Sequence, residues 1–176
     1  MEKHEYYDGE VFAMAGAGYN HNLIVRNGLS SIDNFLKSKP CNVFPSDLKV
    51  HIEANSLFTY PDLSVICGQP QFWNGRTDTV LNPSVLIEVL SKSTQQYDRL
   101  EKFHLYREIP TLKEYVIIYS WEMRLEQYVK KSANEWLLTE FKLPHEQVKL
   151  NSIELSISLQ EFYRDVDFTL EIKTAH

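Results

Sequence analysis

Two carboxylates stand inside apolar segments of this sequence. Asp62 follows Pro61 and opens the apolar run 62–67, and Glu88 lies within the run 85–91, Val-Leu-Ile-Glu-Val-Leu-Ser. An ionised carboxylate removed from water without a partner costs several kcal/mol. Both runs are rich in β-branched residues and predict strands. Two such strands side by side indicate a metal site.

The chemistry that fits these acids is phosphate hydrolysis. If the strands are neighbours, Asp62, Glu88 and the carbonyl of Val89 can hold one divalent cation. Oxygen donors suit Mg²⁺ or Mn²⁺, which bind through one or two carboxylates and substrate phosphates. Such a cation lowers the pKa of a bound water and stabilises charge on a phosphate under attack.

A hydrolase of this kind also needs a cationic side chain near the attacking water. Leu90 stands two residues after Glu88, where a lysine would point the same way. The candidate is Lys102, which is expected on the next helix, one turn after Asp98 and one turn before Tyr106. The three side chains then share a helix face, and Lys102 can reach the cavity of Glu88.

The surrounding elements follow from periodicity and turn residues. Asp8-Gly9 predicts a small hairpin over 5–14, and Asn20 is expected to cap a helix over 20–37. A second helix is expected over 91–109, and Ser158-x-x-Glu161 has the form of a capping box for a brief third one. Besides the strands of Asp62 and Glu88, strands are expected at 43–44, 48–53, 114–120, 124–129, 135–141 and 153–157, with 114–120 central in the sheet.

Composition limits the class of protein. The 176 residues, 43% hydrophobic and 24% charged, fit one domain, 1–176, with an ordinary core. The net charge of −6 argues against non-specific coating of nucleic acid but not against a metal-assisted nuclease. Cys41 and Cys67 lack paired spacing, so we expect reduced, cytoplasmic thiols. No apolar run has the length of a membrane span.

Several segments together resemble the Uma2 family, which belongs to the PD-(D/E)xK nuclease superfamily. The resemblance spans roughly residues 6–162 and is carried by segments 60–68 and 87–94, by Asp98, Lys102 and Tyr106, and by 107–110. It implies an α/β, restriction-endonuclease-like fold with a central mixed β-sheet flanked by helices. It also implies that Asp62 and Glu88 are the metal carboxylates and that Lys102 is a migrated version of the superfamily lysine. Gly9-Glu10 and His21 match the family's N-terminal pattern, without a role that spacing assigns.

Structural explanations exist for each candidate. Asp62 can accept backbone hydrogen bonds at a strand start, and Glu88 can form a buried salt bridge with Lys102, which can also be a solvated lysine. Asp98 suits a helix N-terminus, and Glu10 suits a polar hairpin. The same holds for several other residues that are explained by packing or solvation: His21, Tyr97, Tyr106, Trp73, Arg76, Lys92, Arg99 and Arg107.

The sequence therefore favours a metal-dependent, cytoplasmic endonuclease that hydrolyses DNA with Mg²⁺ or Mn²⁺. A homodimer, with one site for each strand of a duplex, is expected from superfamily analogy alone. Two other classes stay open. One is a non-catalytic interaction module with the nuclease fold, favoured by Leu90 and the net acidity. The other is a hydrolase of small phosphoesters.

Overall fold

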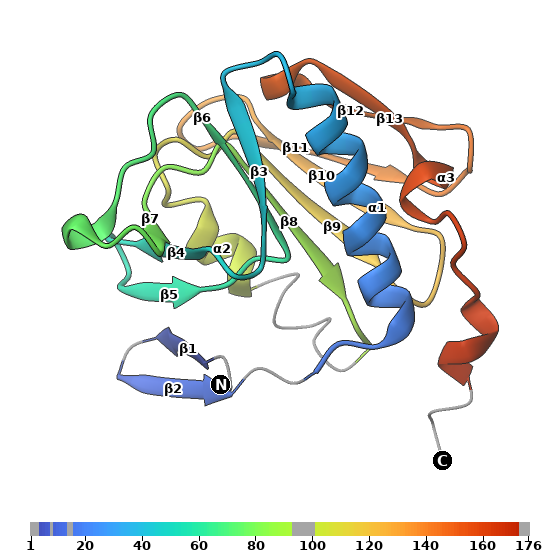
Figure 1. The fold of residues 1–176 in the computed structure, drawn as a ribbon, viewed down its shortest axis with the longest axis horizontal. Helices are drawn as coiled ribbons and strands as arrows, with labels where there is room; N and C mark the ends of the chain where they lie inside the picture. The colour runs from blue at the N-terminus through green and yellow to red at the C-terminus, as the bar shows by residue number, and fades with distance from the viewer. Residues whose placement is uncertain (1–3, 8, 14–15, 93–100, 173–176) are drawn as a thin grey trace.

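A six-stranded mixed sheet forms the centre of the molecule (Figure 1). The computed structural model describes residues 4–7, 9–13, 16–92 and 101–172. The strand order is β11-β10-β9-β8-β6-β3, in which β8 and β9 run parallel and the other neighbours antiparallel. The strands are β3 (Cys41–Pro45), β6 (Leu63–Cys67), β8 (Val85–Leu90), β9 (Glu114–Tyr119), β10 (Leu125–Lys130) and β11 (Trp136–Phe141). The strands of the two candidate acids are thus neighbours, and β9 is central, as the sequence predicted.

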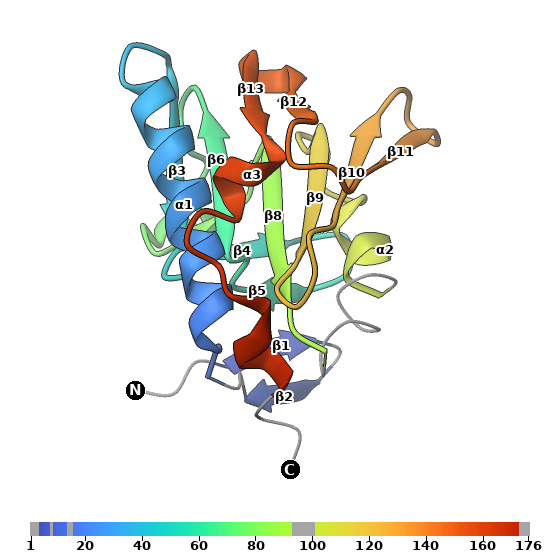
Figure 2. The same cartoon turned by 90° about the vertical axis from the view of Figure 1, so that its right-hand side faces the viewer.

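One face of this sheet is covered by α1 (Tyr19–Leu36) and by elements from the C-terminal part of the chain (Figure 2). The latter are β12 (Gln147–Leu150), the 3₁₀ turn η3 (Asn151–Ile153), β13 (Leu155–Ser158) and α3 (Leu159–Phe162), followed by η4 (Phe168–Ile172). Apolar residues fill the space between these layers. At Gly28, in the middle of α1, an added Cβ would lie 3.1 Å from Leu63 and 3.3 Å from Phe162, so a larger residue there would require these side chains to shift by a few tenths of an ångström.

The other face is covered mainly by a second, five-stranded sheet, where the sequence predicted flanking helices. Its order is β2-β1-β5-β4-β7, and the short α2 (Phe103–Tyr106) lies beside it. Its strands are β1 (His4–Tyr7), β2 (Glu10–Ala13), β4 (Lys49–Ile52), β5 (Leu57–Thr59) and β7 (Thr79–Val80). The N-terminal hairpin was expected, but short strands distant in sequence gave no sign that they form one sheet.

The alternation of β8 decides which layer each of its side chains meets. Ile87 and Val89 belong to the core beneath α1, whereas Leu86 and Leu90 belong to the core beneath the second sheet. Glu88 has the parity of the latter pair and therefore faces the second sheet and α2. Leu90 is fully buried there, which explains an apolar residue at this position.

Two predicted helix caps differ from the structure. The N-cap of α1 is Gly18, and Asn20 lies inside the helix, where its amide donates to the carbonyl of Asp167 at 2.9 Å. Asn20 thus ties the C-terminal segment to α1. Ser158 does precede α3, but its side chain makes no capping hydrogen bond in the described chain. The strand β12 was missed, since the alternation of four residues is too short to distinguish from a loop.

Cys41 and Cys67 form a disulfide, which corrects the expectation of two reduced thiols. The two residues are separated by 26 positions in sequence, without a spacing typical of paired cysteines. They are nonetheless direct partners in the antiparallel pairing of β3 and β6. Cross-strand register is a tertiary property, so the sequence did not reveal the pairing.

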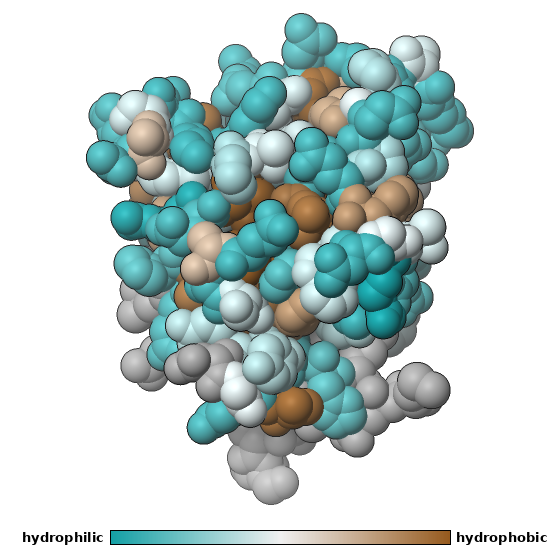
Figure 3. Space-filling view, turned by 90° about the vertical axis from the view of Figure 1, so that its left-hand side faces the viewer, coloured by the Kyte–Doolittle hydropathy of each residue, from teal (hydrophilic) through white to brown (hydrophobic). Residues whose placement is uncertain are grey.

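The side of the molecule that carries β4, β5 and β7 is mostly hydrophilic, with apolar side chains near its centre (Figure 3). Part of the loop after β6 packs on the second sheet, because Trp73 of η1 (Trp73–Gly75) contacts the rings of His51 and Phe58. Arg76 pairs with Asp78 at 2.7 Å in solvent. Loop packing thus accounts for Trp73, whereas Arg76 forms a local ion pair within the exposed loop. Among the described helices, none is long and apolar enough to cross a membrane.

Candidate active site

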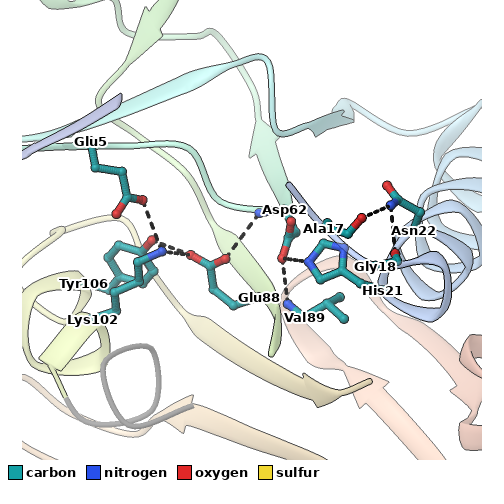
Figure 4. Close-up of polar contacts among 10 residues, drawn as sticks. All are labelled: Glu5, Ala17, Gly18, His21, Asn22, Asp62, Glu88, Val89, Lys102 and Tyr106. Carbon is teal, nitrogen blue, oxygen red and sulfur yellow. Dashed lines mark hydrogen bonds and ion pairs between the residues drawn. The ribbon is translucent and has the colours of Figure 1, made fainter. Parts of the chain in front are cut away.

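Asp62 and Glu88 lie next to each other at the junction of the two sheets (Figure 4). In the antiparallel pairing of β6 and β8, Leu63 is opposite Ile87. Continuing this register by one residue sets Asp62 opposite Glu88, with both side chains on the same side. The backbone N–H of Asp62 donates to Glu88 Oε2 at 3.4 Å, which fixes this carboxylate oxygen toward Asp62.

The carboxylate of Asp62 is held from two sides. The backbone N–H of Val89 donates to Asp62 Oδ2 at 2.8 Å, and His21 Nε2 lies 3.1 Å from the same oxygen. His21 comes from the first turn of α1, so this helix, which covers the opposite face of the large sheet, also contributes to the site. Its other ring nitrogen is buried without a hydrogen bond in the described chain, which favours the tautomer that donates from Nε2.

Glu88 receives two donors from one helical turn. Lys102 Nζ lies 3.2 Å from Glu88 Oε1, and the Tyr106 hydroxyl donates to the same oxygen at 2.6 Å. Lys102 and Tyr106 are four residues apart and therefore share a helix face, as predicted. Lys102 is 5% exposed, so the description as a solvated surface lysine is wrong. The expected salt bridge with Glu88 is present, and it engages Oε1 rather than the oxygen that faces Asp62.

A third carboxylate, Glu5 of β1, completes the cluster. Glu5 Oε1 lies 3.1 Å from Lys102 Nζ and accepts a hydrogen bond from the Thr59 hydroxyl. Because Tyr6 is opposite Phe58, the same register sets Glu5 opposite Thr59 on the inner face of the second sheet. The Thr59 and Tyr106 hydroxyls are 3.2 Å apart. The contacts from Glu88 through Lys102, Glu5, Thr59 and Tyr106 thus form a closed ring.

Exposure increases from this ring toward Asp62. The side chains of Glu88 and Lys102 are each 6% exposed and that of Glu5 is 8%, compared with 17% for Asp62 and 14% for His21. Burial, and then the charge of Glu88, raise the pKa of Tyr106 well above its usual value. Tyr106 is therefore a neutral phenol that donates to Glu88 at any ordinary pH. The ring forms the closed side of the site, and Asp62 forms its open side.

The donor set fits a hard divalent cation. Among the described residues no group of three or more His, Cys, Asp or Glu side chains is arranged to hold a metal ion. The carboxylates of Asp62 and Glu88 are nevertheless adjacent, and Oε2 of Glu88 faces the more exposed Asp62. Mg²⁺ needs only one or two protein carboxylates, because water and substrate phosphate complete its shell. The pair matches that requirement.

The N-terminal hairpin carries two acids, and the structure buries the one that the sequence did not single out. Glu10 is exposed on the hairpin, in agreement with the structural explanation given for it, whereas Glu5 is buried in the site. Glu5 and Tyr6 are successive strand residues and therefore face opposite sides, but the sequence does not reveal which side of a short hairpin turns inward. Asp98 and Tyr97 lie outside the described residues.

Two acidic residues at adjacent strands of a mixed sheet thus lie together, with a lysine beside one of them. The chain belongs to the Uma2 family, whose description is "Putative restriction endonuclease" and whose sequence pattern matches residues 1–166. Two uncharacterized proteins of Synechocystis sp. (strain ATCC 27184 / PCC 6803 / Kazusa) are similar to it. One, slr1290, is 35% identical over 95% of this chain and 86% of the relative. The other, sll1609, is 34% identical over 88% of this chain and 87% of the relative.

A solved structure has the same fold. It is a protein of Anabaena variabilis ATCC 29413, described as "a putative nuclease belonging to DUF820", with a TM-score of 0.74 and 20% identity over 91% of this chain and 89% of the other. The restriction-endonuclease-like fold that the sequence predicted is thereby confirmed.

Proposed function

We propose that this protein is a metal-dependent endonuclease that hydrolyses phosphodiester bonds of DNA. The observation that carries the proposal is the position of Lys102. Its ammonium lies 3.2 Å from one oxygen of Glu88, while the other oxygen of Glu88 faces Asp62. Two carboxylates for a cation and an ammonium for the attacking water therefore meet in one place, although the sequence has Leu90 where a strand lysine would stand.

Asp62, Glu88 and the Val89 carbonyl would hold Mg²⁺ or Mn²⁺. When bound, such a cation supplies positive charge that lowers the pKa of a water molecule and offsets charge on the phosphate. The chain prepares this site by fixing both carboxylates. The Val89 N–H and His21 hold Asp62, and Tyr106 holds Glu88, so that neither side chain has to reorganise on binding.

Lys102 would orient the attacking water and stabilise the negative charge that develops on the phosphate. An ammonium suits this role because it is a compact group that donates in three directions. Its removal from solvent strengthens each of these interactions relative to water.

The metal site is tested by calorimetric titration with Mn²⁺. The parent protein is expected to bind the ion, and Asp62→Ala is expected to lose binding. Absence of binding by the parent, or equal binding by the variant, would remove the metal from the proposal.

The enzymatic part is tested by plasmid nicking with Mg²⁺, Mn²⁺ or Ca²⁺. We expect the parent to nick DNA with Mg²⁺ or Mn²⁺ but not with Ca²⁺, and Lys102→Ala to be inactive in all cases. Cleavage of an RNA and of a DNA of the same length, assayed in parallel, shows which of the two nucleic acids is the substrate. Equal nicking by parent and variant would exclude Lys102 from the mechanism.

A homodimer is part of the same proposal, since cleavage of a duplex on both strands is served by two sites related by a two-fold axis. Sedimentation equilibrium, with and without a short DNA duplex, measures this directly. A monomer under both conditions would limit the proposal to single-strand cleavage events.

A second candidate is a non-catalytic module that retains the nuclease fold. The buried ion pair of Lys102 with Glu88 favours it, because the pair gives the Glu88 carboxylate a charge partner without any metal. The net charge of −6 favours it as well. Mn²⁺ binding without any nicking would support this alternative over the enzyme.

A further inference from the structure

Lys102 reaches the site on a long, flexible side chain from a helix that follows the strand of Glu88. A lysine side chain loses considerable rotamer entropy when it is immobilised. Glu88 alone would hold the ammonium at one point, and the ammonium could still rotate about that contact. A second fixed contact is needed if the ammonium is to occupy one position.

A second contact comes from Glu5. Glu5 approaches Lys102 from the N-terminal hairpin, whereas Glu88 approaches from β8, so the ammonium contacts both carboxylates, at 3.1 Å and 3.2 Å (Figure 4). Glu5 is itself fixed, because Thr59 on the adjacent strand donates a hydrogen bond to the same Oε1 atom that meets Lys102.

The directions of the hydrogen bonds around this ring also determine which oxygen of Glu88 is occupied. The Thr59 hydrogen is committed to Glu5 and the Tyr106 hydrogen to Glu88, so each carboxylate accepts one hydroxyl and one ammonium hydrogen on a single oxygen. This leaves Oε2 of Glu88 turned toward Asp62. Without Glu5, Lys102 could move fully onto Glu88 and compete with a cation for this carboxylate.

We propose that Glu5 is a positioning residue, which holds the Lys102 ammonium at a fixed point beside Glu88 and keeps it from occupying the metal side of that carboxylate. The catalytic consequence rests on the proposed nuclease function. The positioning itself does not, so the two can be tested separately.

The first experiment observes Lys102 directly. In protein carrying ¹⁵N at lysine Nζ, a buried and doubly held ammonium exchanges slowly and gives an observable ¹H–¹⁵N signal, assigned by its absence in Lys102→Arg. We expect this signal in the parent and in Glu10→Gln, which neutralises an exposed acid on the same hairpin. We expect it to broaden or vanish in Glu5→Gln. An unchanged signal in Glu5→Gln would overturn the proposal whether or not the protein cleaves DNA.

The second experiment separates rate from metal affinity. At saturating Mg²⁺, Glu5→Gln should lower kcat at least about tenfold, with Glu5→Asp and Thr59→Val between it and the parent, and Glu10→Gln unchanged. A loss of the lysine signal with an unchanged kcat would overturn the catalytic role.

Folding controls keep both experiments decisive. Each variant is compared by circular dichroism and by its melting temperature. If Glu5→Gln does not fold, Thr59→Val replaces it, because this variant removes the hydrogen bond that fixes Glu5 but keeps the side-chain shape. A parent that shows the lysine signal and no cleavage would refute the proposed function and leave the positioning of Lys102 supported.

Discussion

Two buried glutamates of the large sheet have similar partners but differ in the role that we expect for them. Glu126 on β10 is 1% exposed, accepts from the Tyr119 hydroxyl at 3.0 Å, and pairs with Arg124 at 2.8 Å. Glu88 likewise accepts from a tyrosine and pairs with a cation. A buried, paired glutamate therefore does not by itself indicate an active site.

The difference lies in where the partners come from and what the second oxygen meets. The partners of Glu126 lie within ten residues of it, and its Oε2 accepts from Tyr128 at 3.3 Å, so the cluster ties neighbouring strands together. Glu88 contacts residues from the loop before β6 and from the turn of α2, and its Oε2 accepts from the backbone N–H of a second acidic residue, Asp62. A site is marked by two acids brought together from separate elements.

The largest expected effect is on cleavage. Glu88→Gln should lower the rate of DNA nicking by about a thousandfold, since it removes a charged metal ligand. Glu126→Gln should leave the rate unchanged. Initial rates at saturating Mg²⁺ measure both. Comparable losses in the two variants would show that the clusters do not differ in role.

The next effect is on stability. Lys102→Met leaves Glu5 and Glu88 buried without their shared cation and should reduce the free energy of unfolding by about 3 kcal/mol. Arg124→Met should cost about 1 kcal/mol, because the Arg124 side chain is 24% exposed and solvent screens its ion pairs. Urea unfolding of both variants measures the two losses. A larger loss of stability in Arg124→Met than in Lys102→Met would contradict the prediction.

The disulfide separates stability from chemistry along a single strand. Asp62 precedes one end of β6 and Cys67 forms the other. Replacing Cys41 and Cys67 together by alanine should lower the free energy of unfolding by about 3 kcal/mol, as expected for a loop of this length. The nicking rate at low temperature should not change. A loss of nicking in folded protein would show that the link also sets the position of Asp62.

The smallest effect concerns alkaline pH. The pKa of Tyr106 is raised in the folded protein, so its contribution to stability is fully present below its unfolded pKa of about 10 and is lost as pH rises toward the folded pKa. Above pH 10 the parent should lose up to about 1.4 kcal/mol per pH unit through this group. Tyr106→Phe should show a correspondingly smaller slope in urea unfolding between pH 9 and 11, values chosen about the usual tyrosine pKa. Identical slopes in the parent and in Tyr106→Phe would show that the pKa of Tyr106 is not raised in the folded protein.

Local pattern was sufficient for most elements of the large sheet. The apolar runs around Asp62 and Glu88, the strand β9 and the β10–β11 hairpin were predicted because the pattern of apolar residues that marks a strand lies in consecutive residues. The second sheet as a whole was not predicted, since its strands are two to four residues long and the pairings β1–β5 and β4–β7 join segments distant in sequence. Glu126 escaped notice for a related reason, because its alternating strand resembled one with a solvated face.

The sequence by itself determined the two acids, since an apolar run that carries a single carboxylate has an energetic cost that demands a partner. It also indicated Lys102, through its helical spacing to Tyr106. The tertiary structure alone decided that Glu5 rather than Glu10 joins the site, that His21 meets Asp62, and that Cys41 meets Cys67. The register between distant strands and the inward face of a hairpin result from packing of the whole chain, which no local pattern encodes.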